Sequence, residues 1–80
     1  MKIYQYHGRC NLCGVNVRRL REALGLTQDQ LAARLQVIGL PLTQRAVSRI
    51  ETGERVVADY ELKLLADALE TDTPTLLAQP

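Results

Sequence analysis

The sequence predicts an all-α fold, a compact bundle of about five helices over residues 14–80 with a short N-terminal arm over residues 1–13. Two patterns support this prediction. From residue 14 onward, hydrophobic residues recur at intervals of three and four, the period of a helix with one buried face. Residues that begin or end helices stand between these runs. A length of 80 residues leaves room for a single small domain.

The first two helices have clear ends. Gly25 ends the first helix. The second helix begins at Thr27, because Thr27 and Gln30 form a capping-box pattern that satisfies two unpaired backbone N–H groups. Gly39 and Pro41 end it. The apolar faces of the two helices are formed by Val17, Leu20, Ala23 and Leu24 and by Leu31, Ala32 and Leu35.

Three further helices follow. Thr43 can cap the third helix, and Gly53 can supply the left-handed residue that ends it. Asp59 is the expected cap of the fourth, and Thr73-Pro74 places proline where a short fifth helix would begin. The apolar positions of these helices are Val47 and Ile50, then Leu62, Leu65, Ala66 and Leu69, and finally Leu76 and Leu77.

The N-terminal arm has no helical pattern. The stretch "KIYQY" alternates well enough for a short strand or an ordered arm, and Tyr4 and Tyr6 could instead pack on the bundle. His7, Cys10 and Cys13 are spaced three apart, but a structural zinc site needs about four ligands and the chain has no other Cys or His. We therefore expect no metal and no cofactor, with a metal shared across a dimer or completed by a carboxylate as the alternative. We interpret Cys13 as a small core residue.

The net charge of +1 conceals an asymmetry along the chain. Residues 1–55 contain nine Lys or Arg and four Asp or Glu, whereas residues 56–80 contain one Lys and five acids. A basic portion favours a polyanionic partner, although charge on a small domain often only keeps it hydrated. No apolar run is long enough to cross a bilayer, and no secretion signal is recognisable, so we expect a cytoplasmic protein without a membrane partner.

The third helix separates polar from apolar side chains. At about 100° per residue, Ala46, Val47 and Ile50 fall on one side, and the opposite arc carries Gln44, Arg45, Ser48 and Arg49. Arginine can bind the O6 and N7 atoms of guanine, and glutamine can bind the N6 and N7 atoms of adenine. A hydrated helix face would show the same separation, so this pattern needs support from its context.

Residues 26–55 supply that context. The matching pieces are Leu26-Thr27-Gln28, Leu31-Ala32 and Val47-Ser48-x-Ile50-Glu51-x-Gly53, with "VRRLREALG" before them and "LKLLADAL" after them. In these residues the chain resembles the Cro and phage-repressor-like family of bacterial helix-turn-helix DNA-binding domains, over about residues 14–78. The resemblance implies a lambda-repressor-like bundle that binds double-stranded DNA as a transcriptional regulator of the repressor type, with residues 43–52 reading the major groove.

The resemblance also implies roles for single residues. We expect phosphate contacts from Arg21, Gln28 and Arg55, and a pair between Arg21 and Glu51 that couples the first helix to the third. The wheel supports this pair, because both residues border apolar faces where an unpaired charge would be unfavourable; two independent surface charges are the alternative. The expected base contacts come from Thr43, Gln44, Arg45, Ser48 and Arg49.

The chain departs from the family pattern between Leu35 and Val47, where it runs about five residues longer and contains "QVIGLPL". Either the second helix continues for another turn and Leu40 or Leu42 covers the core, or this loop contacts a protein. We favour the first alternative. The departure leaves the docking angle of the third helix open.

Three classes of function remain to be compared. A single module reads only a half-site, so we expect a homodimer whose contacts use the fifth helix, the N-terminal arm or the 37–42 loop. Alternatively, this chain is one module of a larger protein. The alternative is a protein-interaction module, such as an antitoxin-like or coactivator-like domain, that uses the 37–42 loop. An enzyme is not expected, because the chain has one histidine and no phosphate-binding glycine loop, and no small-molecule substrate is evident.

Overall fold

The computed structural model describes residues 5–79, and within them the fold is all-α, as predicted. Five helices follow one another: α1 (Gly14–Ala23), α2 (Gln28–Val37), α3 (Gln44–Glu51), α4 (Asp59–Ala68) and α5 (Thr73–Leu77). The described part of the chain has no helix with the length and apolar character of a membrane span.

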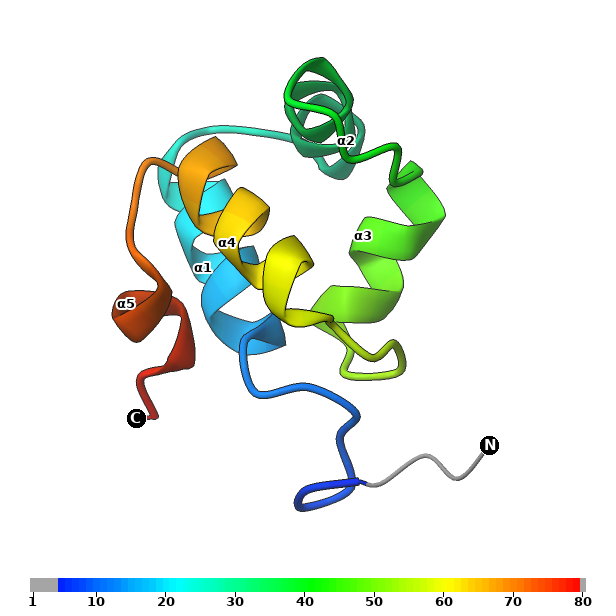
Figure 1. Cartoon of the computed structure of the whole chain (residues 1–80), viewed down its shortest axis with the longest axis vertical. Helices are drawn as coiled ribbons and strands as arrows, with labels where there is room; N and C mark the ends of the chain where they lie inside the picture. The colour runs from blue at the N-terminus through cyan, green and yellow to red at the C-terminus, as the bar shows by residue number, and fades with distance from the viewer. Residues whose placement is uncertain (1–4, 80) are drawn as a thin grey trace.

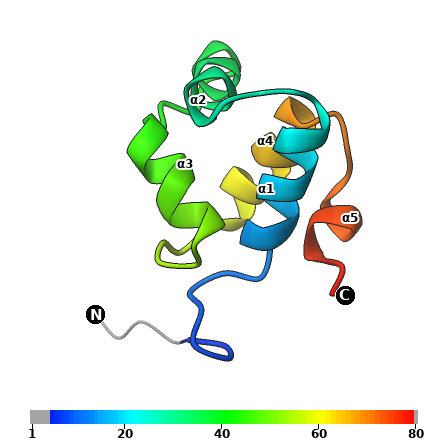
Figure 2. The same cartoon turned by 180° about the vertical axis from the view of Figure 1, so that it is seen from behind.

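The helices surround a single core (Figure 1). α1 packs against α3 and α5, α2 packs against α3 and α4, and α4 packs against α5. In two views from opposite sides, α3 lies at one edge of the molecule and α5 at the other (Figures 1 and 2). α3 is therefore a peripheral helix, supported from one side by α1 and α2.

Residues 5–13 form no helix. Tyr6 and Arg9 exchange backbone hydrogen bonds of 2.8 and 3.1 Å around His7 and Gly8, which both have positive φ, the geometry of a two-residue hairpin turn. Tyr6 is exposed and meets the ring of His7 edge-on at 4.3 Å, so it does not pack into the bundle. The remainder of the predicted "KIYQY" strand, with Tyr4, lies outside the described residues.

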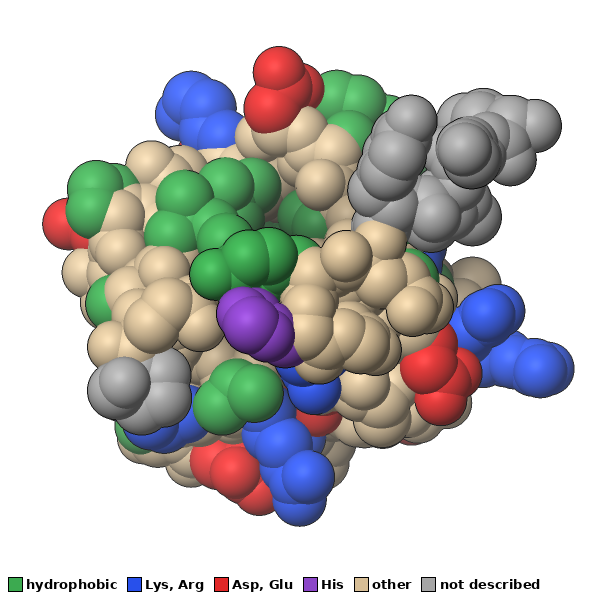
Figure 3. Space-filling model, turned by 90° about the horizontal axis from the view of Figure 1, so that it is seen from below, with side chains coloured by type: hydrophobic (Ala, Val, Ile, Leu, Met, Phe, Trp, Pro, Cys, Tyr) green, Lys and Arg blue, Asp and Glu red, His purple; other side chains and the backbone are tan. Residues whose placement is uncertain are grey.

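The face below the helices combines this turn with the start of α1. Hydrophobic side chains gather around the single histidine there (Figure 3). Tyr6, Leu12 and Val15 are exposed and line a hollow of about 160 Å³ together with His7 and Gln79. Arg9 and Asn11 also line this hollow, and no residue of α3 does.

The predicted helix ends agree with the structure at four places. The Thr27 hydroxyl accepts a hydrogen bond of 3.1 Å from the Gln30 N–H, and the Gln30 side chain accepts one of 2.8 Å from the Thr27 N–H. Thr43 caps α3, and Gly25 and Gly53 follow helix ends with φ of 71° and 82°. These signals succeed because each cap or turn depends on residues close in sequence.

The predicted cap of α4 is wrong. Asp59 is the first helical residue, and Ala58 precedes it as the cap. Alanine has no acceptor in its side chain, so Glu61 reaches back and accepts a hydrogen bond of 3.0 Å from the Ala58 N–H. The third helical residue therefore satisfies the helix start.

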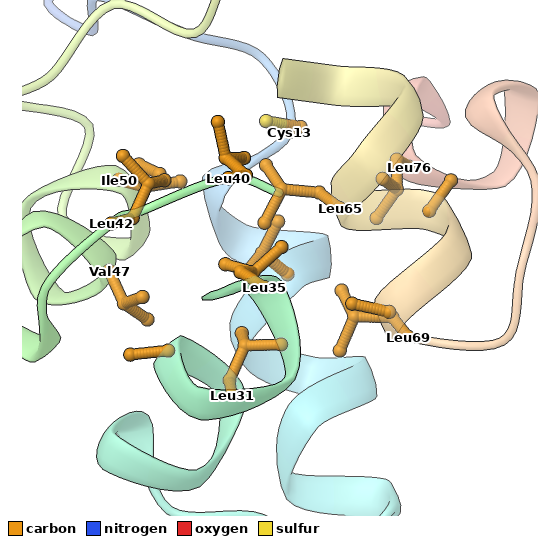
Figure 4. Close-up of a cluster of buried hydrophobic side chains, with 14 residues drawn as sticks. Cys13, Leu31, Leu35, Leu40, Leu42, Val47, Ile50, Leu65, Leu69 and Leu76 are labelled. Carbon is orange, nitrogen blue, oxygen red and sulfur yellow. The ribbon is translucent and has the colours of Figure 1, made fainter. Parts of the chain in front are cut away.

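The core is filled by leucine, valine and isoleucine from all five helices and from the loop before α3. Figure 4 shows these side chains converging, with Leu35 and Leu40 near the centre. Cys13 is fully buried among them, as predicted. Each fully buried aliphatic side chain of this size contributes about 1.5–3 kcal/mol to the free energy of unfolding.

The apolar face predicted for α1 is only partly correct. Val17 is fully buried and Leu20 packs on the core, but Ala23 and Leu24 are exposed. The helix ends at Ala23, and the chain turns away from the core at Leu24. Arg21 takes the buried place instead, because α3 packs over that side of α1.

The long loop before α3 follows the favoured alternative in covering the core, but α2 gains only about half a turn instead of the full turn expected. α2 continues to Val37, two residues past Leu35, and ends through Gly39 with a φ of 94°. Leu40 and Leu42 are then both buried in the core. Val37 remains 87% exposed, so the inserted residues have one core-facing part and one surface part.

Candidate nucleic-acid interface

The polar face of α3 points away from the core. Val47 and Ile50 are fully buried and fix the helix on α1 and α2, whereas Gln44, Arg45 and Arg49 are exposed. The helix is thus anchored along one narrow face and leaves amide and guanidinium groups accessible along the other. These are the side-chain groups that can read base edges in a major groove.

The start of α3 is fixed by the cap. The hydroxyl of exposed Thr43 accepts a hydrogen bond of 3.2 Å from the Ala46 N–H. Ser48 is half-buried and lies one turn after Gln44, on the same side of the helix. All five residues predicted to contact bases therefore lie on the capped first turns of α3, and none is fully buried.

Three side chains connect the starts of α2 and α3 to the buried end of α3. The Gln44 amide donates a hydrogen bond of 2.6 Å to Gln28, and the Gln28 amide donates one of 3.0 Å to Oε1 of Glu51. Gln28 is half-buried between its two partners. The predicted phosphate contact and one predicted base contact are therefore physically linked.

The predicted pair of Arg21 and Glu51 is a buried, bidentate ion pair. Nε and Nη2 of Arg21 donate to Oε2 and Oε1 of Glu51 at 2.6 and 3.1 Å, and 11% and 3% of the two side chains are exposed. The hydrogen bonds to Glu51 raise the pKa of Arg21. Nη1 donates to the Leu26 carbonyl at 2.7 Å, so little of this guanidinium faces solvent for a phosphate.

Arg55 is also engaged within the protein. Its Nη1 and Nη2 atoms lie 3.0 and 3.1 Å from the carboxylate oxygens of Glu61, and this hydrogen bonding raises the pKa of Arg55. Nη1 also donates to the Val56 carbonyl at 3.0 Å. The side chain is partly exposed, so a phosphate contact from it would have to compete with Glu61. This pair was not predicted from the sequence, because a spacing of six residues does not bring two side chains together on a helix.

A hollow of about 420 Å³ lies along α3 beside the loop that follows it, lined by Thr43, Arg45, Ala46, Arg49, Glu54, Arg55 and Val56. Three arginines stand on its walls with one glutamate. Glu54 lies 3.5 Å from Arg49, and both side chains are more than half exposed, so solvent screens this pair. The hollow is therefore basic and open to a polyanion.

Two residues at the interface were missed by the sequence analysis. Arg9 donates a hydrogen bond of 3.0 Å to the Glu51 carbonyl, and the Asn11 amide donates to the carbonyls of Ile50 and Arg55. They lie in the N-terminal arm, where the sequence shows only the alternation of "KIYQY" and the spacing of His7, Cys10 and Cys13. A single arginine or asparagine outside a periodic segment gives no sequence signal of such long-range bonds.

The described residues contain no group of three His, Cys, Asp or Glu side chains arranged to hold a metal ion. Cys13 is part of the core, and burial raises the pKa of its thiol to about 11. A thiol with so high a pKa stays protonated at neutral pH and is a poor metal ligand.

Comparison with known proteins also indicates a helix-turn-helix domain. A helix-turn-helix family model matches residues 17–76, which contain α2, the connecting turn and α3. No curated protein and no solved structure matches the chain. Because the family match covers most of the chain, this protein belongs to the helix-turn-helix family of the Cro and phage-repressor type, which is a family of DNA-binding domains.

Proposed function

We propose that this protein binds double-stranded DNA sequence-specifically and regulates transcription as a repressor, with α3 in the major groove. The observation that carries the proposal is the exposure of Gln44, Arg45 and Arg49 on a helix whose opposite face is fully buried. An anchored helix holds these side chains in one orientation, which direct reading of bases requires. The basic hollow beside α3 offers a place for the phosphate backbone.

The exposure of each side chain indicates whether it contacts bases, contacts phosphates or acts indirectly. Arg45 and Arg49 are the exposed arginines of α3 and suit guanine, and Gln44 suits adenine. Gln28 stands at the start of α2, where a side chain and free backbone N–H groups together can bind a phosphate. Arg21 serves indirectly in this proposal, because its ion pair with Glu51 fixes α1 against α3.

We propose a homodimer as the active form, since one such module covers only one half-site and two half-sites lie about 34 Å apart on DNA. Exposed Leu12 and Leu77 lie in the N-terminal arm and in α5, two of the regions expected to supply dimer contacts. Sedimentation of the protein alone and with its duplex measures this stoichiometry. We expect the regulator to act in the cytoplasm of a bacterial cell, where its DNA lies.

A selection experiment tests the main proposal. The protein is incubated with a randomised duplex library, and binding to the recovered site is titrated at several salt concentrations. A dimer with about eight phosphate contacts should give a log–log slope near −7. Recovery of no preferred sequence would refute the proposal.

Matched variants assign the roles. Arg45→Ala should relax base preference at one position by about 1–3 kcal/mol. Lys63→Ala removes an equal charge from α4, where Lys63 lies 3.6 Å from Asp67, and should leave base preference unchanged. A uniform loss of affinity over all sequences in Arg45→Ala would show that Arg45 contacts only phosphate.

A second candidate function rests on the inserted residues. Val37 is 87% exposed, and Ile38 is exposed beside it. Both line a hollow of about 290 Å³ with Arg34, Ala68 and Glu70. An apolar surface of this kind suits a protein partner, as in an antitoxin-like or coactivator-like domain. This function is compatible with DNA binding, because no residue of α3 lines this hollow.

A further inference from the structure

A short docked segment, residues 9–14, closes the C-terminal end of α3. It lies before the family match, which begins at Val17. Four backbone carbonyls within residues 50–55 accept hydrogen bonds from this segment. They are those of Ile50, Glu51, Gly53 and Arg55. Ile50 and Glu51 end α3, and a donor from outside stabilises a helix end because the last carbonyls have no partner within the helix; Gly53 and Arg55 lie in the loop that follows.

Asn11 makes the central contacts. Its Nδ2 donates to the Ile50 carbonyl at 3.1 Å and to the Arg55 carbonyl at 2.7 Å, and its Oδ1 accepts from the Gly14 N–H at 2.8 Å. The opposite orientation of the amide would place an oxygen against two carbonyl oxygens. One side chain therefore joins the start of α1, the end of α3 and the loop that follows α3.

Arg9 makes the second contact. Its Nη2 donates to the Glu51 carbonyl at 3.0 Å, which places a positive charge at the C-terminal end of α3, where the helix dipole favours it. The Arg9 side chain lies flat against Gly53: a Cβ atom at that position would stand 2.7 Å from Cζ of Arg9. A Cβ atom at Gly14 would collide with the Ile50 carbonyl. Gly53 thus leaves space for the Arg9 side chain, and Gly14 lets the end of the docked segment lie close to the Ile50 carbonyl.

The loop that receives these bonds forms part of the basic hollow. Glu54, Arg55 and Val56 line one side of that hollow, and Arg45 and Arg49 line the other. The Cys10 N–H donates to the Gly53 carbonyl at 2.7 Å, and Asn11 holds the Arg55 carbonyl, so both ends of this loop are tied to the docked segment. The loop is therefore held beside α3 both by its own bonds, from the Glu54 and Arg55 N–H groups to the Arg49 carbonyl, and by the docked segment, whose residues do not line the hollow.

We propose that the docked segment is a positioning element of the DNA-binding surface, and that Arg9 and Asn11 are its positioning residues. They set the distance between α3 and the loop at residues 52–56, so that bases and backbone can be contacted together. This inference deepens the proposed function and rests on it. It gives a role in DNA binding to residues outside the matched family region.

The chain provides a matched control. Asn16 also uses one amide to hold two carbonyls, those of Leu76 and Ala78, at 3.0 and 2.7 Å, but its partners lie in α5 and just after it. Asn11→Ala and Asn16→Ala therefore remove equivalent bonds at opposite edges of the molecule. Affinity for the duplex recovered from the randomised library is measured for both, at a temperature where circular dichroism shows each variant to be folded and at a concentration where sedimentation shows each to have the oligomeric state of the wild type.

We expect Asn11→Ala to lower the affinity about tenfold, or about 1.4 kcal/mol, because the loop at residues 52–56 is no longer held beside α3, and Asn16→Ala to change it by less than about twofold. Amide hydrogen exchange at residues 52–56 should be faster than in the wild type for Asn11→Ala and unchanged for Asn16→Ala. Equal affinities in the two variants would overturn the inference, whereas a wild-type protein that recovers no duplex would overturn the proposed function itself.

If Asn11→Ala does not fold, Arg9→Ala replaces it. Its control is Arg19→Ala, because Arg19 contacts Asn16 at 3.4 Å. A lower affinity in Arg9→Ala than in Arg19→Ala would then support the inference, and equal affinities would overturn it.

Discussion

Gln44 donates a hydrogen bond of 2.6 Å to Gln28, which joins the first residue of α3 to the first residue of α2. Gln28 is itself held by its bond to Glu51. Because Gln44 uses one N–H in this bond, its carbonyl oxygen and its second N–H remain for a base. That remaining pair, one acceptor and one donor, complements the N6 and N7 atoms of adenine.

The first prediction concerns this glutamine pair. Gln28→Ala should weaken binding to every duplex and should also reduce preference at the position read by Gln44, because Gln44 loses the partner that orients it. A double-mutant cycle with Gln44→Ala measures the coupling, which should be about 0.5–3 kcal/mol. The measurement is the affinity for the selected duplex and for its single-base variants. Additive effects would mean that the two glutamines act independently.

The second prediction concerns the ion pair of Arg21 and Glu51. Arg21→Met leaves a buried carboxylate without its partner and should lower the free energy of unfolding by about 3–5 kcal/mol. The double variant Arg21→Met/Glu51→Leu should recover much of this loss. Urea unfolding followed by circular dichroism gives the free energies.

The exposed pair of Arg18 and Glu22, 3.6 Å apart, is the control. Arg18→Ala should change the free energy of unfolding by less than about 1 kcal/mol, because solvent screens a surface pair. A similar loss in Arg18→Ala and Arg21→Met would contradict a special role for the buried pair.

The parts of the fold that were predicted correctly depend on residues close in sequence. Thr27 with Gln30, Thr43 and Gly53 fix helix ends through bonds or backbone angles within a few residues. The buried pair of Arg21 and Glu51 was also predictable, since both residues border an apolar face where an isolated charge is unfavourable. Caps and glycines therefore predicted helix boundaries, and the helical period, together with the family resemblance, predicted one long-range contact.

The parts that were missed depend on the final packing. Asn11 bonds to carbonyls 39 and 44 residues away, and a backbone carbonyl has no residue-specific signal in the sequence. Leu24 follows the helical period but falls where the chain has already turned away from the core. The cap at Asp59 was misplaced by one residue, because Glu61 supplied the acceptor from inside the helix.

The third prediction separates the two parts of the inserted loop. Leu40→Ala should lower the free energy of unfolding by about 2–5 kcal/mol, because it leaves a cavity in the core. Val37→Ser alters an exposed side chain and should change stability by less than about 0.5 kcal/mol. Urea unfolding of both variants checks the difference. Val37→Ser should also leave DNA affinity intact, and a clear loss there would show that the inserted residues take part in DNA binding or dimerisation.

The fourth prediction concerns acid stability and Glu61. Hydrogen bonds from Arg55 lower the pKa of this carboxyl below its ordinary value of 4.5, and the bond from the Ala58 N–H acts in the same direction. The unfolded chain therefore binds a proton at Glu61 at a higher pH than the folded protein does. The stabilisation is fully present above pH 4.5 and is lost as the pH falls through the lower pKa of the folded state.

Urea unfolding at pH 7, 5, 4 and 3 measures this effect. Glu61→Gln should be less stable than the wild type at pH 7, and its free energy of unfolding should fall less between pH 5 and pH 3. Asp72, whose pKa is lowered by hydrogen bonds from Thr75, adds an acid-dependent loss to both proteins, so the difference between them isolates Glu61. Parallel curves for wild type and Glu61→Gln would mean that the pair of Arg55 and Glu61 does not stabilise the folded state, and that Arg55 is free to turn toward a phosphate.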